Sequence, residues 1–261
     1  MTISENVGFI GSGGIACAMA RGLLKSPEFT GRICLSVHKN ADRAKAVQLL
    51  SPERVFLREA NQQIVDEAEI IVPALLPKVL EEVAPTLKFS KENHVIHITA
   101  FWKLLAAAPW YAPSCGMVRS VPLPFSADRM GPVVVYGDDQ LCLDLLAMIG
   151  SVVKVKTEKE LETLAALTGM MDAYYGAVAE MVGWCGTKGM DFQSALDYAT
   201  EMNEALSVHM RRNCTKDVET FLRENATPGG TNELGLKTLR ETQAYKPWSE
   251  ALEKIGKRYG I

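Results

Sequence analysis

The chain has 261 residues, of which 48% are hydrophobic and 23% are charged, a balance typical of folded globular proteins rather than disordered or fibrous ones. Its formal net charge of −3 provides no broad basic surface, which argues against a nucleic-acid-binding function. The six cysteines are scattered without a C-x-x-C pair, so neither a disulfide framework nor a metal site is expected. The polar N-terminus and the lack of a long apolar run predict a cytoplasmic protein without a signal peptide or transmembrane helix.

The first half of the chain alternates short β-branched apolar runs with stretches of helical periodicity. We expect strands at 7–10, 32–37, 69–72, 95–99, 117–121 and 132–136, and helices at 16–24 and 41–50. Strands without internal polar alternation, separated by helices, indicate a mainly parallel sheet covered on both faces. The fold class predicted is therefore α/β, with an N-terminal Rossmann-like doubly wound domain.

After Thr157 strand-like runs disappear and helical periodicity continues to the C-terminus. We expect helices at 158–183, 192–211 and 248–259, and we place the domain boundary between 156 and 157, with an all-helical domain over 157–261. The long first helix of this domain is apolar enough to need cover from another subunit. The sequence therefore predicts a homodimer or a larger homo-oligomer formed through the helical domain.

A glycine-rich turn follows the first predicted strand and matches G-x-G-x-x-A, with Gly11, Gly13 and Ala16 at the defined positions. Gly11 permits a tight turn, Gly13 lets the backbone approach a pyrophosphate, and Ala16 allows close packing of helix on strand. The amides of a helix N-terminus then face the phosphates. We therefore expect this turn to bind a dinucleotide, through Gly11, Ser12, Gly13, Gly14, Ile15 and Ala16.

The end of the second predicted strand bears on the choice of coenzyme. An NAD-selective site places a carboxylate there to hold the ribose 2′-hydroxyl, whereas this chain reads Val37-His38-Lys39-Asn40. Lys39 and Arg43 are suited to meet a 2′-phosphate. We therefore expect His38, Lys39 and Asn40 to contribute to coenzyme binding, with NADPH preferred and NADH as the alternative.

A second informative stretch spans residues 226–239 and contains Thr227-Pro228-Gly229-Gly230-Thr231. This pattern is typical of a chain-reversing turn, and Thr231 or Asn232 is suited to cap the helix that follows. Such a turn aims several amides in one direction, which suits a small carboxylate. From the residues alone, a structural helix start and an anion site are equally good readings.

The segment resembles the C-terminal signature of pyrroline-5-carboxylate reductases, S-P-G-G-T-T-x-x-G-L-x-x-L, and the order of motifs resembles that family along nearly the whole chain. The resemblance implies NAD(P)H-dependent reduction of 1-pyrroline-5-carboxylate to L-proline, with oligomers formed through the helical domain. It also implies that Gly229, Gly230 and Thr231 hold the substrate carboxylate. Asn232 then stands where the family has its second threonine, and we expect it to orient the ring nitrogen.

Further departures from the family pattern surround the same predicted site. Leu76 replaces the lysine of A-V-K-P, Pro124 falls in the segment that replaces P-N-T-P, and Met171 falls in the segment that replaces S-G-S-G-P-A-Y. Asp172 lies in an otherwise apolar stretch beside Tyr174 and Tyr175, where burial would raise its pKa and suit it to act as an acid. Catalytic candidates are thus Asn232, Thr231 and Asp172.

Three alternatives stay open at this point. The substrate is a different cyclic imine or imino acid, as the four altered positions suggest. A 3-hydroxyacid or ketone dehydrogenase on the same architecture would need a lysine on the long helix, and Lys159 lies too near the start of that helix. A catalytically silent NADPH-binding protein would retain the glycine turn equally well.

Overall fold

The computed structural model describes residues 2–261, which form two compact units. The first unit ends at Ala165 and the second comprises Ala166–Ile261. The sequence placed a boundary between 156 and 157, whereas the structure keeps the first two turns of helix α7 (Glu158–Thr168) with the sheet. Among residues 2–261, no helix combines the length and apolarity needed to cross a membrane.

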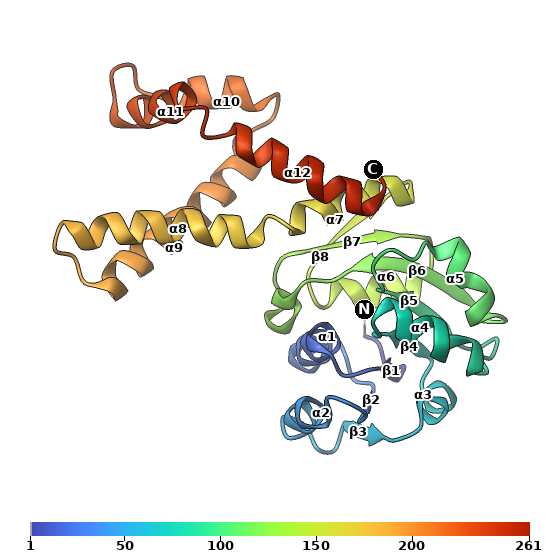
Figure 1. The fold of residues 1–261 in the computed structure, drawn as a ribbon. Helices are drawn as coiled ribbons and strands as arrows, with labels where there is room; N and C mark the ends of the chain where they lie inside the picture. The colour runs from blue at the N-terminus through green and yellow to red at the C-terminus, as the bar shows by residue number, and fades with distance from the viewer. Residues whose placement is uncertain (1) are drawn as a thin grey trace. The chain divides into compact units, whose positions relative to one another are not determined.

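An eight-stranded sheet forms the centre of the first unit, in the order β3-β2-β1-β4-β5-β6-β7-β8 (Figure 1). The strands are β1 (Val7–Ile10), β2 (Ile33–Ser36), β3 (Val55–Arg58), β4 (Ile70–Pro73), β5 (His94–His97), β6 (Gly116–Val121), β7 (Pro132–Tyr136) and β8 (Ser151–Val155). All neighbouring pairs are parallel except β6 and β7. The α/β class with a mainly parallel sheet is thus confirmed.

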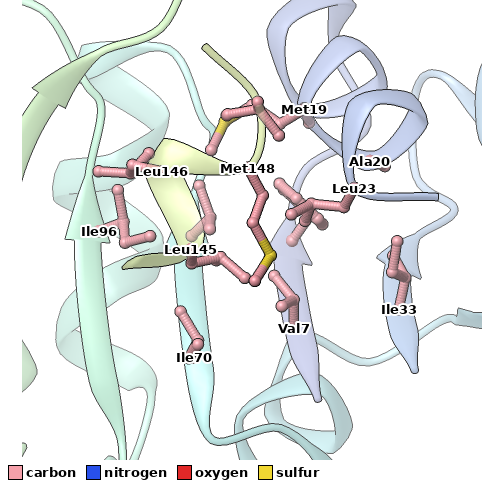
Figure 2. Close-up of a cluster of buried hydrophobic side chains, with 14 of the residues drawn as sticks. Val7, Met19, Ala20, Leu23, Ile33, Ile70, Ile96, Leu145, Leu146 and Met148 are labelled. Atoms are coloured by element: carbon pink, nitrogen blue, oxygen red, sulfur yellow. The ribbon is translucent and has the colours of Figure 1, made fainter. Parts of the chain in front are cut away.

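Helices cover both faces of this sheet, and the two-residue period of the strands sorts the core residues between the faces. The helices are α1 (Gly14–Lys25), α2 (Ala41–Gln48), α3 (Asn61–Glu67), α4 (Pro77–Val83), α5 (Leu104–Tyr111) and α6 (Gln140–Ala147). One core cluster joins Val7 and Phe9 to α1, α2 and α6, and Figure 2 shows Met19, Leu145 and Met148 within it. The other cluster joins Ile10 and Ile71 to α3, α4 and α5.

The second unit is helical, as the sequence predicts. It contains α8 (Met171–Thr187), α9 (Phe192–Asn213), α10 (Val218–Asn225), α11 (Thr231–Glu241) and α12 (Lys246–Tyr259), together with the end of α7. Helices α8 and α9 share a small core of Val178, Val182, Ala195 and Ala199.

The single helix predicted over 158–183 is wrong, because α7 ends at Thr168 and α8 begins at Met171. Gly169 lies in this break, and a Cβ added there would come within 2.8 Å of Ile255 on α12. The close approach of α12 therefore requires a residue without a side chain at this position. Helical periodicity continues across the break, which explains why a single helix was predicted over 158–183.

Candidate active site

The turn between β1 and α1 has the geometry of a dinucleotide-binding turn. Gly11 has φ +104°, and a Cβ on it would lie 2.6 Å from the Ala74 carbonyl oxygen, so glycine is required there. Gly13 is the N-cap of α1, and Ala16 is fully buried on the side that packs on the sheet. The predicted residues 11–16 thus all lie at this junction of strand and helix.

The space in front of the turn is open. No heavy atom of residues 2–261, chain neighbours aside, lies within 4 Å of the position that a Cβ on Gly13 would take. The amides of the first helical turn have no partner within the helix, and the positive end of its dipole lies there. Ser12 is buried, and its hydroxyl donates to the Asn40 carbonyl oxygen at 3.4 Å. The residues present therefore fit a pyrophosphate group.

The loop between β2 and α2 provides cationic side chains beside this turn. His38 and Lys39 are exposed, and Asn40 is the N-cap of α2. Arg43, on the first turn of α2, has its Nη1 atom 3.9 Å from the position of a Cβ on Gly14. A guanidinium beside the phosphate-binding turn, with Lys39 on the adjoining loop, suits a second phosphate group.

The segments that follow β4 and β5 are joined by a buried hydroxyl. Thr99 Oγ1 lies 3.3 Å from the Pro73 carbonyl oxygen and 3.4 Å from that of Leu75. A Cβ on Gly11 would come within 3.0 Å of the Leu75 side chain, so this segment borders the dinucleotide turn. Ligands of open α/β sheets bind outside the carboxyl ends of the strands, at the point where the strand order reverses. Here that point lies between β1 and β4.

His97 holds the loop after β5 from inside the protein. Its Nε2–H donates to the Trp102 carbonyl oxygen at 3.1 Å, so its Nδ1 accepts from the Tyr111 hydroxyl at 2.9 Å. Burial lowers the pKa of His97 to about 4 and raises that of Tyr111. His97 is therefore neutral at physiological pH and acts as a structural link rather than as a proton shuttle.

Arg119 lies opposite His97 in the parallel pair of β5 and β6. Its Nη1 atom lies 2.9 Å from Glu158 Oε1 and 3.1 Å from Glu162 Oε1, and Arg119 and Glu162 are both buried. Glu158 Oε1 also accepts from the Leu104 amide at 2.8 Å. This ion-pair cluster keeps the start of α7 with the sheet and fixes the beginning of α5.

The C-terminal signature forms the turn before α11, but its capping differs from the expectation. Gly230 is the N-cap, and Thr231 and Asn232 are exposed residues of the first helical turn, so neither is the cap. The Gly230 amide donates to the Thr227 carbonyl oxygen at 2.8 Å, and the Gly229 amide donates to Glu233 Oε2 at 2.6 Å. Both glycine amides expected to hold a substrate carboxylate are therefore already hydrogen-bonded.

Asp172 differs from the expectation as well, because it is exposed in the first turn of α8. The neighbouring Tyr174 and Tyr175 are also exposed, with their rings 6.0 Å apart. The burial that the sequence predicted for Asp172 is therefore missing in the chain. An acidic side chain in the first turn instead complements the dipole of α8.

The structure also brings together three side chains that the sequence did not connect, His94, Asp139 and Cys142. The His94 Nδ1–H donates to Asp139 Oδ2 at 2.7 Å, and Asp139 Oδ1 accepts from the Cys142 amide at 2.9 Å as the cap of α6. Burial raises the pKa of the Cys142 thiol. These residue types can bind metal ions, but the carboxylate already has a capping role. The signal available in the sequence was Asp139 before a helical run.

Two family models match the chain. The first, described as NADP oxidoreductase coenzyme F420-dependent, matches residues 6–101. The second, described as pyrroline-5-carboxylate reductase dimerisation, matches residues 158–260.

Two pyrroline-5-carboxylate reductases align with nearly the full length of this chain. A pyrroline-5-carboxylate reductase of Arabidopsis thaliana is 25% identical, over 91% of this chain and 88% of that protein. Pyrroline-5-carboxylate reductase 2 of Bacillus subtilis (strain 168) is 24% identical, over 97% of this chain and 94% of that protein.

Solved structures share the fold. The 1-pyrroline-5-carboxylate reductase of Streptococcus pyogenes has a TM-score of 0.82 at 20% identity, covering 99% of both chains. The pyrroline carboxylate reductase of Plasmodium falciparum, with NADP bound, has a TM-score of 0.82 at 16% identity, covering 99% of this chain and 98% of that one. An imine reductase from Pseudomonas sp. is less similar, with a TM-score of 0.57 at 14% identity over 80% of this chain and 76% of that one.

Proposed function

Because the chain is a distant member of the pyrroline-5-carboxylate reductase family, we propose that it reduces the C=N bond of a cyclic imine with NAD(P)H. The observation that carries this proposal is the open glycine turn at the start of α1, in which Gly11 is required by its backbone and Gly13 leaves room for a pyrophosphate. When bound there, the coenzyme supplies a hydride to the imine carbon.

NADPH is the preferred coenzyme in this proposal. Arg43 lies beside Gly14, and Lys39 lies on the loop before α2. Two cations near the expected ribose would favour a 2′-phosphate over a hydroxyl. Replacing Arg43 by Gln should raise the KM for NADPH about tenfold or more and leave the KM for NADH nearly unchanged. Lys45→Gln, on the same helix, is the matched control.

The residues that follow the Pro-Gly-Gly turn would serve the substrate. Thr231 offers a hydroxyl and Asn232 an amide, both exposed in the first turn of α11. Asn232 is a hydrogen-bond donor but a poor proton source. An iminium ion is already electrophilic near neutral pH, so orientation of the nitrogen by Asn232 suffices. The proposal does not require Asp172 as an acid.

The natural substrate of the family is the first to test. 1-Pyrroline-5-carboxylate would need a site for its carboxylate, and the first-turn amides of α11 with the Thr231 hydroxyl are the groups that could supply one. The relatives and the Thr231 position favour this substrate. The engagement of the Gly229 and Gly230 amides argues for a different cyclic imine.

The deciding experiment follows NADPH oxidation at 340 nm with 1-pyrroline-5-carboxylate, 1-pyrroline, 1-pyrroline-2-carboxylate and Δ1-piperideine-2-carboxylate, each with NADPH and with NADH. Turnover of any of them, lost in Asn232→Ala and weakened in Gly13→Ala, would support the proposal. NADPH binding without turnover of any cyclic imine would refute it and identify a catalytically silent coenzyme-binding protein.

The helical unit would join two copies of the chain. Helices α8 and α9 and the loop between them form a mainly apolar hollow lined by Glu180, Met181, Trp184, Cys185, Met190, Ala195, Tyr198, Ala199 and Met202. Trp184 is 63% exposed and Tyr198 is 72% exposed, which is unusual for side chains of this size. A second copy of the same unit would bury them in a two-fold interface.

A further inference from the structure

Three side chains with metal-binding groups converge at the edge of the sheet where β5 begins. His94 is the first residue of β5, Asp139 is the N-cap of α6, and Cys142 lies in the first turn of that helix. One ligand atom of each lies within 4.8 Å of those of the other two. We propose that this cluster binds one Zn²⁺ ion in a structural role. The inference goes beyond the proposed reductase function and does not depend on it.

The cluster lies at the edge of the sheet opposite the coenzyme turn. Strands β1, β4, β5 and β6 are parallel to one another, so their first residues share one edge and their last residues share the other. The glycine turn follows Ile10, the last residue of β1. His94 instead pairs with Gly116, the first residue of β6. A metal ion bound here would be remote from the coenzyme, which points to a structural rather than a catalytic role.

Two glycines provide the room that the carboxylate needs. A Cβ on Gly116 would collide with Asp139 Oδ2, so the glycine opposite His94 lets the aspartate reach the imidazole. Gly137, with φ +121°, brings the chain before Asp139 against β6, because a Cβ there would lie 2.9 Å from the Met117 carbonyl oxygen. Side chains at these two positions would push the carboxylate away from His94.

Helix capping leaves one oxygen of Asp139 for another partner. Oδ1 accepts from the Cys142 amide at 2.9 Å, and Oδ2 accepts from His94 Nδ1–H at 2.7 Å. The cap therefore orients the carboxylate, as a hydrogen bond to a metal-binding group commonly does. Cys142 is three residues beyond Asp139, so its thiol lies on the same side of the first helical turn.

One imidazole, one carboxylate and one thiolate form a ligand set that favours Zn²⁺. Mg²⁺ and Ca²⁺ prefer oxygen ligands throughout, whereas Zn²⁺ binds nitrogen, oxygen and sulfur in a tetrahedral arrangement. Water would supply the fourth ligand, and it can approach beside His94, whose side chain is 20% exposed. Cys142 is fully buried, so its sulfur would close the inner side of the site.

The charges balance when the ion binds. The Cys142 thiol gives its proton to solvent and binds as a thiolate. The His94 proton moves from Nδ1 to Nε2, so the ring stays neutral and Nδ1 is free to bind. Zn²⁺ together with the thiolate and the Asp139 carboxylate then has no net charge, which suits a mostly buried place.

Only small movements of the ligands are needed. Zn–N and Zn–O bonds of about 2.0–2.2 Å at a tetrahedral angle place the two ligand atoms roughly 3.3 Å apart. The distance between His94 Nδ1 and Asp139 Oδ2 is 2.7 Å, so rotation of the partly exposed histidine would admit the ion. The ion would then join the start of β5 to the start of α6, although His94 and Asp139 are 45 positions apart in the chain.

Metal binding is tested on the full-length chain without a histidine tag, after EDTA has removed any bound metal. Titration should show one Zn²⁺ per chain with a Kd of about 1 μM or lower, and saturation should raise the melting temperature by roughly 5 °C. Co²⁺ in place of Zn²⁺ should give the visible spectrum of a tetrahedral site and the near-ultraviolet absorption of a cobalt–thiolate bond. That absorption reports a cysteine ligand in the wild-type chain, so it does not depend on a variant that folds.

Variants identify the ligands. Cys142→Ser should abolish the cobalt–thiolate absorption, and His94→Gln should weaken Zn²⁺ binding about tenfold or more. Cys115→Ser is the matched control, because Cys115 is exposed and precedes Gly116, and it should bind Zn²⁺ as the wild type does. Absence of a stoichiometric ion in the wild type would overturn the inference. So would a cobalt–thiolate absorption that persists in Cys142→Ser and disappears in Cys115→Ser.

Discussion

His97 on β5 and Arg119 on β6 are paired residues of neighbouring parallel strands, and both side chains are buried. Their environments differ in one respect. Arg119 has two carboxylate partners, Glu158 and Glu162, whereas His97 is bonded to neutral groups, the Tyr111 hydroxyl and the Trp102 carbonyl. The charge of Arg119 is therefore balanced by carboxylates, whereas His97 must stay neutral.

Stability should fall in mild acid because of His97. Burial lowers its pKa from 6.5 to about 4, so the unfolded chain binds a proton more readily than the folded one between these values. The free energy of unfolding should be fully retained above about pH 6.5 and decrease by about 3 kcal/mol as the pH falls to 4. The melting temperature (Tm) measured from pH 7.5 to 4.5 checks this. His97→Gln should have a shallower pH dependence, and equal slopes for both proteins would contradict the assignment.

Removal of Arg119 should be strongly destabilising. Arg119→Met leaves Glu158 and Glu162 without their cation in a buried place, at a cost of about 3–5 kcal/mol, and should lower Tm by roughly 10 °C. Lys25→Met is the matched control, since the pair of Lys25 with Asp128 is more than half exposed and contributes at most about 1 kcal/mol. Similar losses of stability in the two variants would show that the buried cluster contributes no more than the exposed pair of Lys25 and Asp128.

The two glycines of the coenzyme turn should respond differently to alanine. Gly11→Ala would place a Cβ 2.6 Å from a carbonyl oxygen at a positive φ, so it should lower stability by roughly 1–3 kcal/mol. Gly13 has φ −70° and open space around it. Gly13→Ala should keep Tm within about 2 °C and weaken NADPH binding about tenfold or more, as measured by fluorescence titration. Unchanged affinity of Gly13→Ala for NADPH would show that the coenzyme phosphates do not bind at this turn.

Charge placed in the apolar hollow of α8 and α9 should separate the subunits. Trp184→Glu would place a carboxylate at the proposed interface in both copies, a cost counted twice by two-fold symmetry. Sedimentation velocity should then show dimers for the wild-type chain and monomers for the variant. Leu49→Glu, an exposed position on the first unit, should remain dimeric. A wild-type chain that is monomeric at all concentrations tested would contradict the proposed dimer.

The fold could be predicted from sequence where strands are buried on both faces. Residues of β1 and β4 are apolar without interruption and fully buried, and their runs were visible in the sequence. The strands β3 and β8 were missed, because both lie at the edges of the sheet and carry partly exposed residues such as Arg58 and Lys154. An edge strand has a neighbouring strand on one side only, so its side chains are less buried and its run of apolar residues is harder to recognise in the sequence.

The candidate site could be predicted only in its local parts. The glycine turn needs just a strand, a turn and a helix in succession, so Gly11 and Gly13 were visible in the sequence. Contacts between distant segments were not, such as the bond from Thr99 to the segment after β4. The contact of Glu233 with the Gly229 amide is local, yet it was overlooked because a glutamate in a first helical turn usually indicates helix capping.

The close approach of Gly169 and Ile255 has a consequence for how the chain folds during synthesis. The two residues stand at opposite ends of the second unit in sequence, so the junction of α7 and α8 cannot be packed until α12 has left the ribosome. The sheet of the first unit, by contrast, is complete in sequence at Val155. We therefore expect the first unit to fold before the helical unit, while α12 is still being synthesised.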